Sequence, residues 1–139
     1  MSVSEAQKIV LPEEGTMYDW IGGELVLRKL VDRFYDVMDT SDYATTIRAL
    51  HKQDLSPMRE GLFEYLSGWL GGPPLYIEKN GSPCISKPHM PFHIDQAASE
   101  AWLKCMDQAM VDTDINEQYR TLLMSALERV ADTLINSHD

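Results

Sequence analysis

The chain has 139 residues, the usual size of a single domain. Hydrophobic residues make up 44% of it, and 12 Lys and Arg against 22 Asp and Glu give a net charge of −10. This acidity argues against nucleic acid and anionic membranes as partners, because both require a basic face. No apolar run approaches the roughly 20 residues of a membrane span, and no signal peptide is visible. We therefore expect a cytoplasmic protein that contacts no membrane.

The N-terminal part is mixed and polar. We expect residues 1–15 to form an extension and residues 16–139 to form one domain, because Pro12 to Gly15 interrupt regular structure. Residues 18–21 predict a short helical turn. Gly22 and Gly23 end it, since two glycines in a row favour a change of direction.

The strongest helical pattern covers residues 24–39. Its apolar residues recur at spacings of three and four, which predicts one buried face. They are Leu27, Leu30, Val31, Phe34, Tyr35 and Met38. The pattern in residues 42–50 is weaker and predicts one or two short turns before a corner at His51.

A second long helix is predicted over residues 58–70. Ser56 and Pro57 have the form of an N-cap followed by proline at the first helical position. The apolar face comprises Met58, Leu62, Tyr65, Leu66 and Trp69. The glycines and prolines of residues 71–74 end this helix, and we expect residues 75–83 to be a connector.

Two further helices are predicted in the C-terminal part. Asp95 is a good N-cap for a helix reaching about Val111, and Asn116 is one for the last helix. Cys105 lies on the apolar face of the first and is expected in the core. No segment has the alternation of a strand, so the chain is predicted to be all-α.

Residues 85–92 form an irregular segment that holds one histidine. Pro88 and Pro91 prevent a regular helix there, because proline lacks an N–H and restricts the residue before it. A stiff segment that presents His89 to an apolar interior suits a metal ligand. From the residues alone, an ordinary loop histidine is the alternative.

The order and spacing of several short motifs resemble those of truncated haemoglobins, specifically the second group of that family. The similarity runs from about Met17 to Asn136. Its motifs are Gly22-Gly23, Phe34-Tyr35, Leu50-His51, Leu66-Ser67-Gly68-Trp69-Leu70-Gly71-Gly72-Pro73, His89-Met90-Pro91-Phe92 and Trp102-Leu103-Lys104-Cys105-Met106. The resemblance implies a two-over-two helical sandwich around haem b, iron protoporphyrin IX.

The resemblance also assigns roles on the proximal side of the haem, where a histidine coordinates the iron. His89 matches the proximal histidine, the axial ligand, whose other ring nitrogen would donate to a backbone carbonyl. His93 is a further histidine nearby, but only His89 fits the motif. Lys87 stands where the family often has arginine near a haem propionate. We also expect Tyr76 and Phe92 to contact the haem.

On the opposite, distal side the resemblance places three polar side chains. Tyr35 matches the distal tyrosine, Trp102 the distal tryptophan, and His51 the corner position. Met58 and Leu62 lie one turn apart on the helix that would cross this face. Donors aimed at a diatomic ligand would slow its escape. Whether Tyr35 or His51 coordinates the iron without an external ligand stays open.

The function expected from this set is oxygen binding or transport, with dioxygen, carbon monoxide and nitric oxide as ligands. An enzymatic role, either peroxidase-like or oxidising nitric oxide, is the alternative. A helical interaction module without a cofactor is a third. We also expect an unidentified reductase as a partner. The oligomeric state is expected to be a monomer or a weak dimer.

Overall fold

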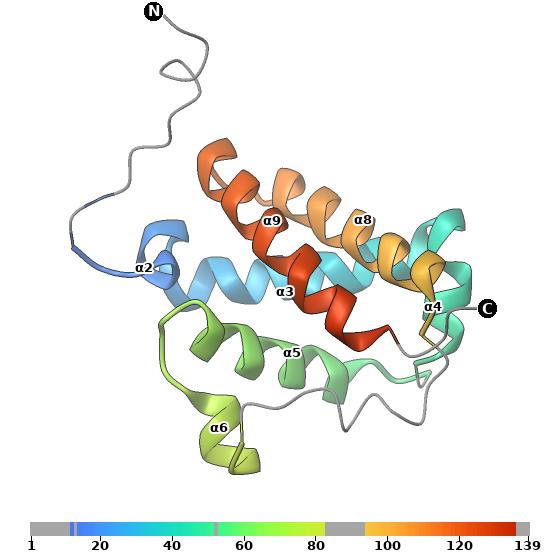
Figure 1. The fold of residues 1–139 in the computed structure, drawn as a ribbon, viewed down its shortest axis with the longest axis horizontal. Helices are drawn as coiled ribbons and strands as arrows, with labels where there is room; N and C mark the ends of the chain where they lie inside the picture. Colours follow the sequence, from blue (N-terminus) through green and yellow to red (C-terminus); the bar gives the residue numbers. More distant parts are fainter. Residues whose placement is uncertain (1–11, 13, 52, 83–93, 136–139) are drawn as a thin grey trace, which may run out of the picture.

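The computed structural model describes residues 12, 14–51, 53–82 and 94–135, and the regular structure in this part of the chain is helical (Figure 1). This confirms the all-α prediction. The elements are α2 (Met17–Ile21), α3 (Gly23–Thr40), η1 (Asp42–Ala44), α4 (Thr45–Ala49), α5 (Ser56–Trp69), α6 (Leu75–Asn80), α8 (Gln96–Asp112) and α9 (Glu117–Leu134).

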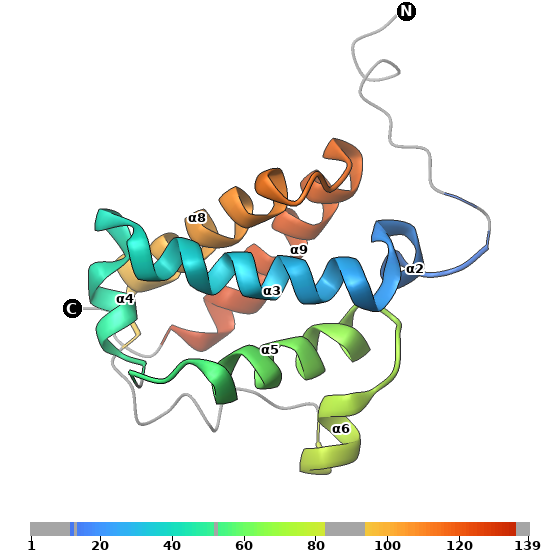
Figure 2. The same cartoon turned by 180° about the vertical axis from the view of Figure 1, so that it is seen from behind.

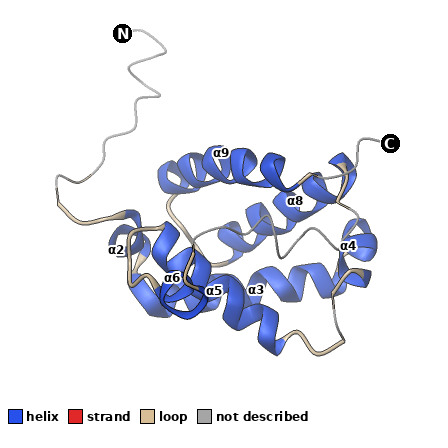
Figure 3. Ribbon diagram, turned by 60° about the horizontal axis from the view of Figure 1, so that its bottom comes forward, coloured by secondary structure: helices blue, strands red, loops and turns tan. Residues whose placement is uncertain are grey.

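The four long helices form two antiparallel pairs, one packed over the other. Helices α3 and α5 make one pair, α8 and α9 make the other, and α3 crosses α8 (Figure 2). Figure 3 shows the two pairs from a tilted direction, with α8 and α9 on one side of α3 and α5. Cys105 of α8 is fully buried in the same core cluster as Phe34 of α3, which confirms its predicted place in the core.

Side-chain caps fix the starts of the C-terminal helices. Asp95 accepts a hydrogen bond from the Ala98 N–H at 2.8 Å, and Asn116 accepts one from the Gln118 N–H at 2.8 Å. Both predicted N-caps are confirmed. The prediction for Ser56 is wrong, because α5 already includes this residue and the Asp54 carboxylate accepts its N–H at 3.0 Å.

The predicted connector over residues 75–83 is also wrong in its first part, where α6 forms. Pro74 precedes this helix, and Gly81 ends it in the left-handed conformation with φ of 74°. This helix has only six residues and none of them is fully buried, so a helical period could not be recognised in its sequence.

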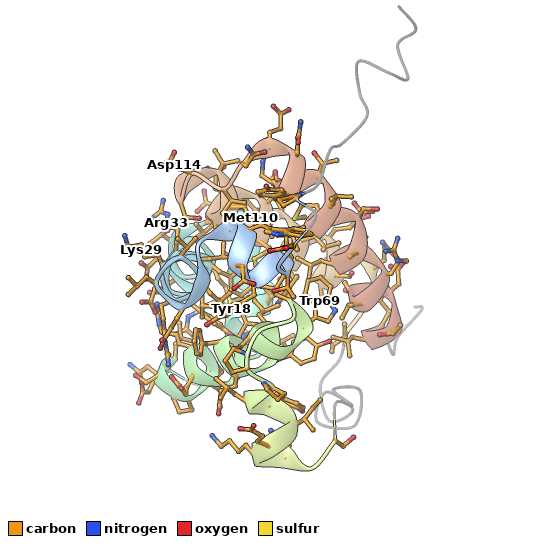
Figure 4. The ribbon with its side chains drawn as sticks, turned by 90° about the vertical axis from the view of Figure 1, so that its left-hand side faces the viewer. Tyr18, Lys29, Arg33, Trp69, Met110 and Asp114 are labelled. Carbon is orange, nitrogen blue, oxygen red and sulfur yellow. The ribbon has the colours of Figure 1, made fainter. Side chains whose placement is uncertain are left out.

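Helix α2 is held against the end of α5 by a close backbone approach. The Tyr18 N–H donates to the Leu70 carbonyl at 3.0 Å, and a Cβ on Gly72 would come within 2.5 Å of the Tyr18 ring. Figure 4 looks from this end of the molecule and shows Tyr18 and Trp69 here, with Lys29 and Arg33 on the outer side. The predicted end of α2 is confirmed at Gly22, which has φ of 120°.

An arginine from α5 ties that helix to α3. Arg59 donates to the Asp32 carbonyl at 2.9 Å and to the Asp36 carboxylate at 2.9 Å. A second arginine, Arg28, lies over the Phe63 ring with its guanidinium carbon 3.6 Å from the ring centroid. These contacts hold α5 against α3.

None of the helices in the described part of the chain has both the length and the apolar character needed to cross a membrane.

Candidate functional site

A cavity of about 430 Å³ lies between the two helix pairs. Most of its surface is apolar, and its size is within the usual range of small-molecule and cofactor sites. The described residues that line it are Tyr35, Ile47, Leu50, His51, Met58, Gly61, Leu62, Tyr65, Leu66, Tyr76, Ile94, Ala98, Ser99, Trp102, Leu127, Val130, Ala131 and Leu134. It therefore brings together every described residue that was predicted to contact the cofactor.

Tyr35 comes from the middle of α3 and is 5% exposed. Its hydroxyl donates to the Met58 carbonyl at 3.3 Å, a long hydrogen bond and therefore a weak one. Burial raises the pKa of the phenol above its ordinary value of 10.0, and the Arg59 guanidinium nearby lowers it by a smaller amount. The hydroxyl is thus kept protonated and held by a contact that costs little to break.

His51 follows α4 at the corner and packs edge-on against Tyr35, with ring centroids 6.0 Å apart. Its Nδ1 lies 2.7 Å from the Ile47 carbonyl oxygen, which accepts hydrogen bonds and cannot donate one. Nδ1 therefore carries the proton, and in the neutral ring Nε2 is an acceptor. A neutral imidazole in this tautomer would offer a ligand an acceptor rather than a donor.

Trp102 reaches the cavity from α8, one turn before the buried Cys105. Its ring centroid lies 5.0 Å from that of Phe34, with the two planes tilted by 59°. Phe34 in turn packs edge-on against Tyr35 at 4.9 Å. Phe34 therefore lies against both the indole and the phenol, which restricts the orientation of each ring.

Helix α5 supplies the wall beside Tyr35 through Met58, Gly61 and Leu62. Helix α6 adds Tyr76, whose ring packs edge-on against Tyr65 with centroids 5.5 Å apart. Three further residues that were predicted to contact haem, Lys87, His89 and Phe92, lie outside the described residues.

Helices α8 and α9 form the opposite wall with residues that sequence reasoning did not assign to a site. Leu127, Val130 and Leu134 recur at spacings of three and four in the last helix, and this apolar face is the signal that could have found them. Ser99 had no such signal, because serine in a helix usually indicates an exposed position. It is 4% exposed.

Comparisons with known proteins agree with this arrangement. The family model for bacterial-like globins matches residues 16–136. A curated relative, group 2 truncated hemoglobin YjbI of Bacillus subtilis (strain 168), is 34% identical over 119 residues, which are 86% of this chain and 87% of that protein.

Two solved structures also superpose closely. The group II 2-on-2 hemoglobin of Agrobacterium tumefaciens is 38% identical, with a TM-score of 0.85 over 91% of this chain and 98% of that one. The cold-adapted truncated hemoglobin of Pseudoalteromonas haloplanktis TAC125 is 39% identical, with a TM-score of 0.86 over 89% of this chain and 100% of that one.

A two-over-two helical fold around a mainly apolar cavity is the architecture of a small globin. The chain belongs to the truncated globin family and, within it, to the group II truncated haemoglobins. Membership is consistent with gas binding through haem.

The residues of the cavity fit such a group. A flat, largely apolar cofactor requires apolar walls, and the lining supplies them from both helix pairs. Gly61 leaves further room, because a Cβ built on it would meet no atom within 4 Å. The buried Ser99 hydroxyl has no hydrogen-bond partner among the described residues, as expected of a group that an occupant would satisfy.

Proposed function

We propose that this chain holds haem b and binds dioxygen, carbon monoxide or nitric oxide at its iron. The observation that carries the proposal is the cavity itself, which has mainly apolar walls and whose lining includes a phenol, an indole and an imidazole. Haem, when bound, supplies an iron atom with one coordination position for the protein and one for a diatomic ligand.

In this proposal His89 is the protein ligand of the iron. The support is the sequence motif around it, because imidazole nitrogen is the usual axial ligand of globin haem. Propionate contacts for Lys87 and haem contacts for Phe92 are proposed on the same basis.

Tyr35 is the proposed donor to a bound diatomic ligand. Its O–H bond now points to the Met58 carbonyl, and a turn of the hydroxyl about its C–O bond releases it from that 3.3 Å contact. Because the phenol is buried and protonated, it meets a partly negative ligand in surroundings that strengthen the hydrogen bond.

Trp102 and His51 have different proposed roles. The indole N–H of Trp102 is a permanent donor, since tryptophan has no acceptor. The neutral His51 ring is fixed by its 2.7 Å contact with the Ile47 carbonyl and contributes packing and an acceptor. Met58 and Leu62 shape the space between these groups, and Tyr76 packs at the cavity edge against Tyr65.

The test replaces each of two nearby histidines by glycine. Purified His89→Gly protein should bind haem weakly and without the spectrum of an imidazole complex, and added free imidazole should restore that spectrum. His93→Gly is the matched control and should resemble the unmodified chain. The proposal fails if the His89 variant keeps a normal spectrum, or if the unmodified chain takes up no haem.

Several finer expectations stay predictions. These are the cytoplasmic location, the reductase, the oligomeric state, and the peroxidase-like or nitric-oxide-oxidising alternatives. The family supports gas binding rather than a transport role, so the proposal is confined to binding.

A further inference from the structure

Arg59, in the first turn of α5, is held by two acidic side chains of α3. Its guanidinium donates to the Asp32 carboxylate at 3.2 Å and to the Asp36 carboxylate at 2.9 Å. It also donates to the Asp32 carbonyl at 2.9 Å. Asp32 and Asp36 lie one turn apart on α3 and share one face of it. Several contacts to neighbouring acceptors orient a planar guanidinium more closely than a single ion pair would.

The same guanidinium lies over the ring of Tyr35. Its central carbon is 5.7 Å from the ring centroid, within the roughly 6 Å range of a cation–aromatic contact. Arg59 is not among the described residues that line the cavity, whereas Tyr35 is. An effect of Arg59 on a molecule in the cavity would therefore be transmitted through Tyr35.

A positive charge beside a phenol draws electron density from the ring and makes the hydroxyl a stronger donor. Burial raises the pKa of Tyr35, and the Arg59 guanidinium lowers it by a smaller amount, which is the sign expected of such a charge. The neighbouring ionisable groups are Asp32 and Asp36, which pair with Arg59, and His51, whose ring packs edge-on against Tyr35. Of these groups, Arg59 is the one with a permanent positive charge.

A second arginine links the same two helices and provides a comparison. Arg28 of α3 donates to the Glu60 carboxylate at 3.1 Å and lies over the ring of Phe63, with its central carbon 3.6 Å from the centroid. Phe63 has no hydroxyl, and neither Arg28 nor Phe63 is among the described residues that line the cavity. The two arginines thus make the same kinds of contact and differ in the ring that they cover.

We propose that Arg59 is a positioning residue that sets how strongly Tyr35 donates to a ligand bound at the haem iron. Asp32 and Asp36 hold its guanidinium over the phenol, and the charge polarises the hydroxyl without touching the ligand. Because a stronger donor slows the escape of a ligand, Arg59 would help to determine how long the ligand stays bound. This inference rests on the proposed function, in which Tyr35 is the donor.

The first test measures dioxygen release by stopped flow in three variants. Arg59→Gln removes the charge and should release dioxygen about two- to fivefold faster, the factor that corresponds to an ordinary cation–aromatic contact. Arg59→Lys keeps the charge and should return the rate toward that of the unmodified chain. Arg28→Gln, the matched control, should leave the rate unchanged.

Neither glutamine variant leaves a buried charge. The side chains of Asp32 and Asp36 are 63% and 54% exposed, and that of Glu60 is 48% exposed. These carboxylates stay hydrated when the arginine is replaced, so we expect both variants to fold, with a small and similar loss of stability in urea unfolding. A difference in dioxygen release between them is then not explained by a looser contact of α5 with α3.

A double variant shows whether Arg59 acts through the hydroxyl of Tyr35. Tyr35→Phe keeps the ring and removes the hydroxyl, so adding Arg59→Gln to it should not change dioxygen release further. The infrared C–O stretching band of the carbon monoxide complex gives a second readout, because its frequency rises when a donor toward the ligand weakens. Arg59→Gln alone should raise this frequency, and it should have no effect when combined with Tyr35→Phe.

A third measurement uses the full chain without haem. With carbon-13 at the tyrosine Cζ atoms, the nuclear magnetic resonance signal of Tyr35 is identified by its loss in Tyr35→Phe. This signal should shift in Arg59→Gln and keep its position in Arg28→Gln, because Arg59 covers the Tyr35 ring and Arg28 covers that of Phe63.

The outcomes separate this inference from the function on which it rests. An unmodified chain that takes up no haem overturns both. A chain that takes up haem and binds dioxygen, but in which Arg59→Gln changes neither dioxygen release nor the C–O band, overturns only the role of Arg59. The same holds if Arg28→Gln speeds release as much as Arg59→Gln does, or if the effect of Arg59→Gln persists in the Tyr35→Phe background.

Discussion

At the scale of single residues, Tyr35 is the side chain whose chemistry matters most to the proposal. Its hydroxyl is 3.3 Å from the Met58 carbonyl oxygen. This long hydrogen bond competes only weakly with a hydrogen bond to a bound ligand. The neighbouring Phe34 ring keeps the phenol in position while the hydroxyl turns.

Tyr35→Phe should therefore release dioxygen about tenfold faster than the unmodified chain. A hydrogen bond to a charged group contributes about 1.5–3 kcal/mol, and the broken Met58 contact reduces the net gain. Stopped-flow dissociation kinetics measure this. Tyr65→Phe is the control, since Tyr65 also lines the cavity but packs against Tyr76. Equal rates for both variants would remove Tyr35 from the ligand site.

The raised pKa of Tyr35 also predicts how stability depends on alkaline pH. Above the ordinary value of 10.0 the unfolded phenol loses its proton while the folded one keeps it. The folded state then binds more protons, so stability falls as pH rises, by at most about 1.4 kcal/mol per pH unit. Denaturant midpoints between pH 9 and about 11 should fall less in Tyr35→Phe. If the midpoints of Tyr35→Phe and the unmodified chain fall in parallel, burial does not raise the pKa of this phenol.

At the scale of elements, the contact of α2 with the end of α5 depends on a glycine. Gly71 has φ of 92°, and a Cβ there would come within 2.7 Å of the Thr16 side chain. Gly71→Ala should destabilise the chain by about 1–3 kcal/mol, combining backbone strain with a clash. Urea unfolding without haem measures this.

The matched control for that experiment is Gly61→Ala. Gly61 is inside α5, and a Cβ there would meet no atom within 4 Å. Gly61→Ala should therefore stabilise the chain by about 0.5–1 kcal/mol, because alanine favours the helix more than glycine does. If Gly71→Ala and Gly61→Ala shift the midpoint equally, the close approach of α2 does not contribute to stability.

The long helices could be predicted from the sequence because each carries a clear apolar face, and the two C-terminal ones also carry a capping signal. Asp95 and Asn116 are examples, since their side chains form the expected bonds. Helix α6 could not be predicted, because six residues are too few to show a helical period. Ser56 was assigned the wrong position because Asp54, two residues earlier, supplies the side-chain acceptor.

The grouping of the polar cavity residues followed from the resemblance to truncated haemoglobins. Tyr35, His51 and Trp102 were expected in one pocket, and all three line the same cavity. The tautomer of His51 required the position of the Ile47 carbonyl, which depends on how α4 folds. Ser99 required knowledge of what surrounds its hydroxyl, and no local sequence pattern contains that information.

At the scale of the whole molecule, two helix pairs enclose a mainly apolar cavity of about 430 Å³ in a chain that belongs to the group II truncated haemoglobins. A cavity of this kind is expensive to leave empty, because its lining lacks packing contacts. The fold therefore makes most physical sense with a large, flat and mostly apolar group between the pairs.

The most direct measurement is the absorption spectrum of the purified full chain after addition of haem, in the oxidised, reduced and carbon monoxide-treated states. We predict an intense Soret band that sharpens and shifts when carbon monoxide is added to the reduced protein. A spectrum identical to that of free haem, with no change beyond that of free haem on adding carbon monoxide, would contradict the proposal.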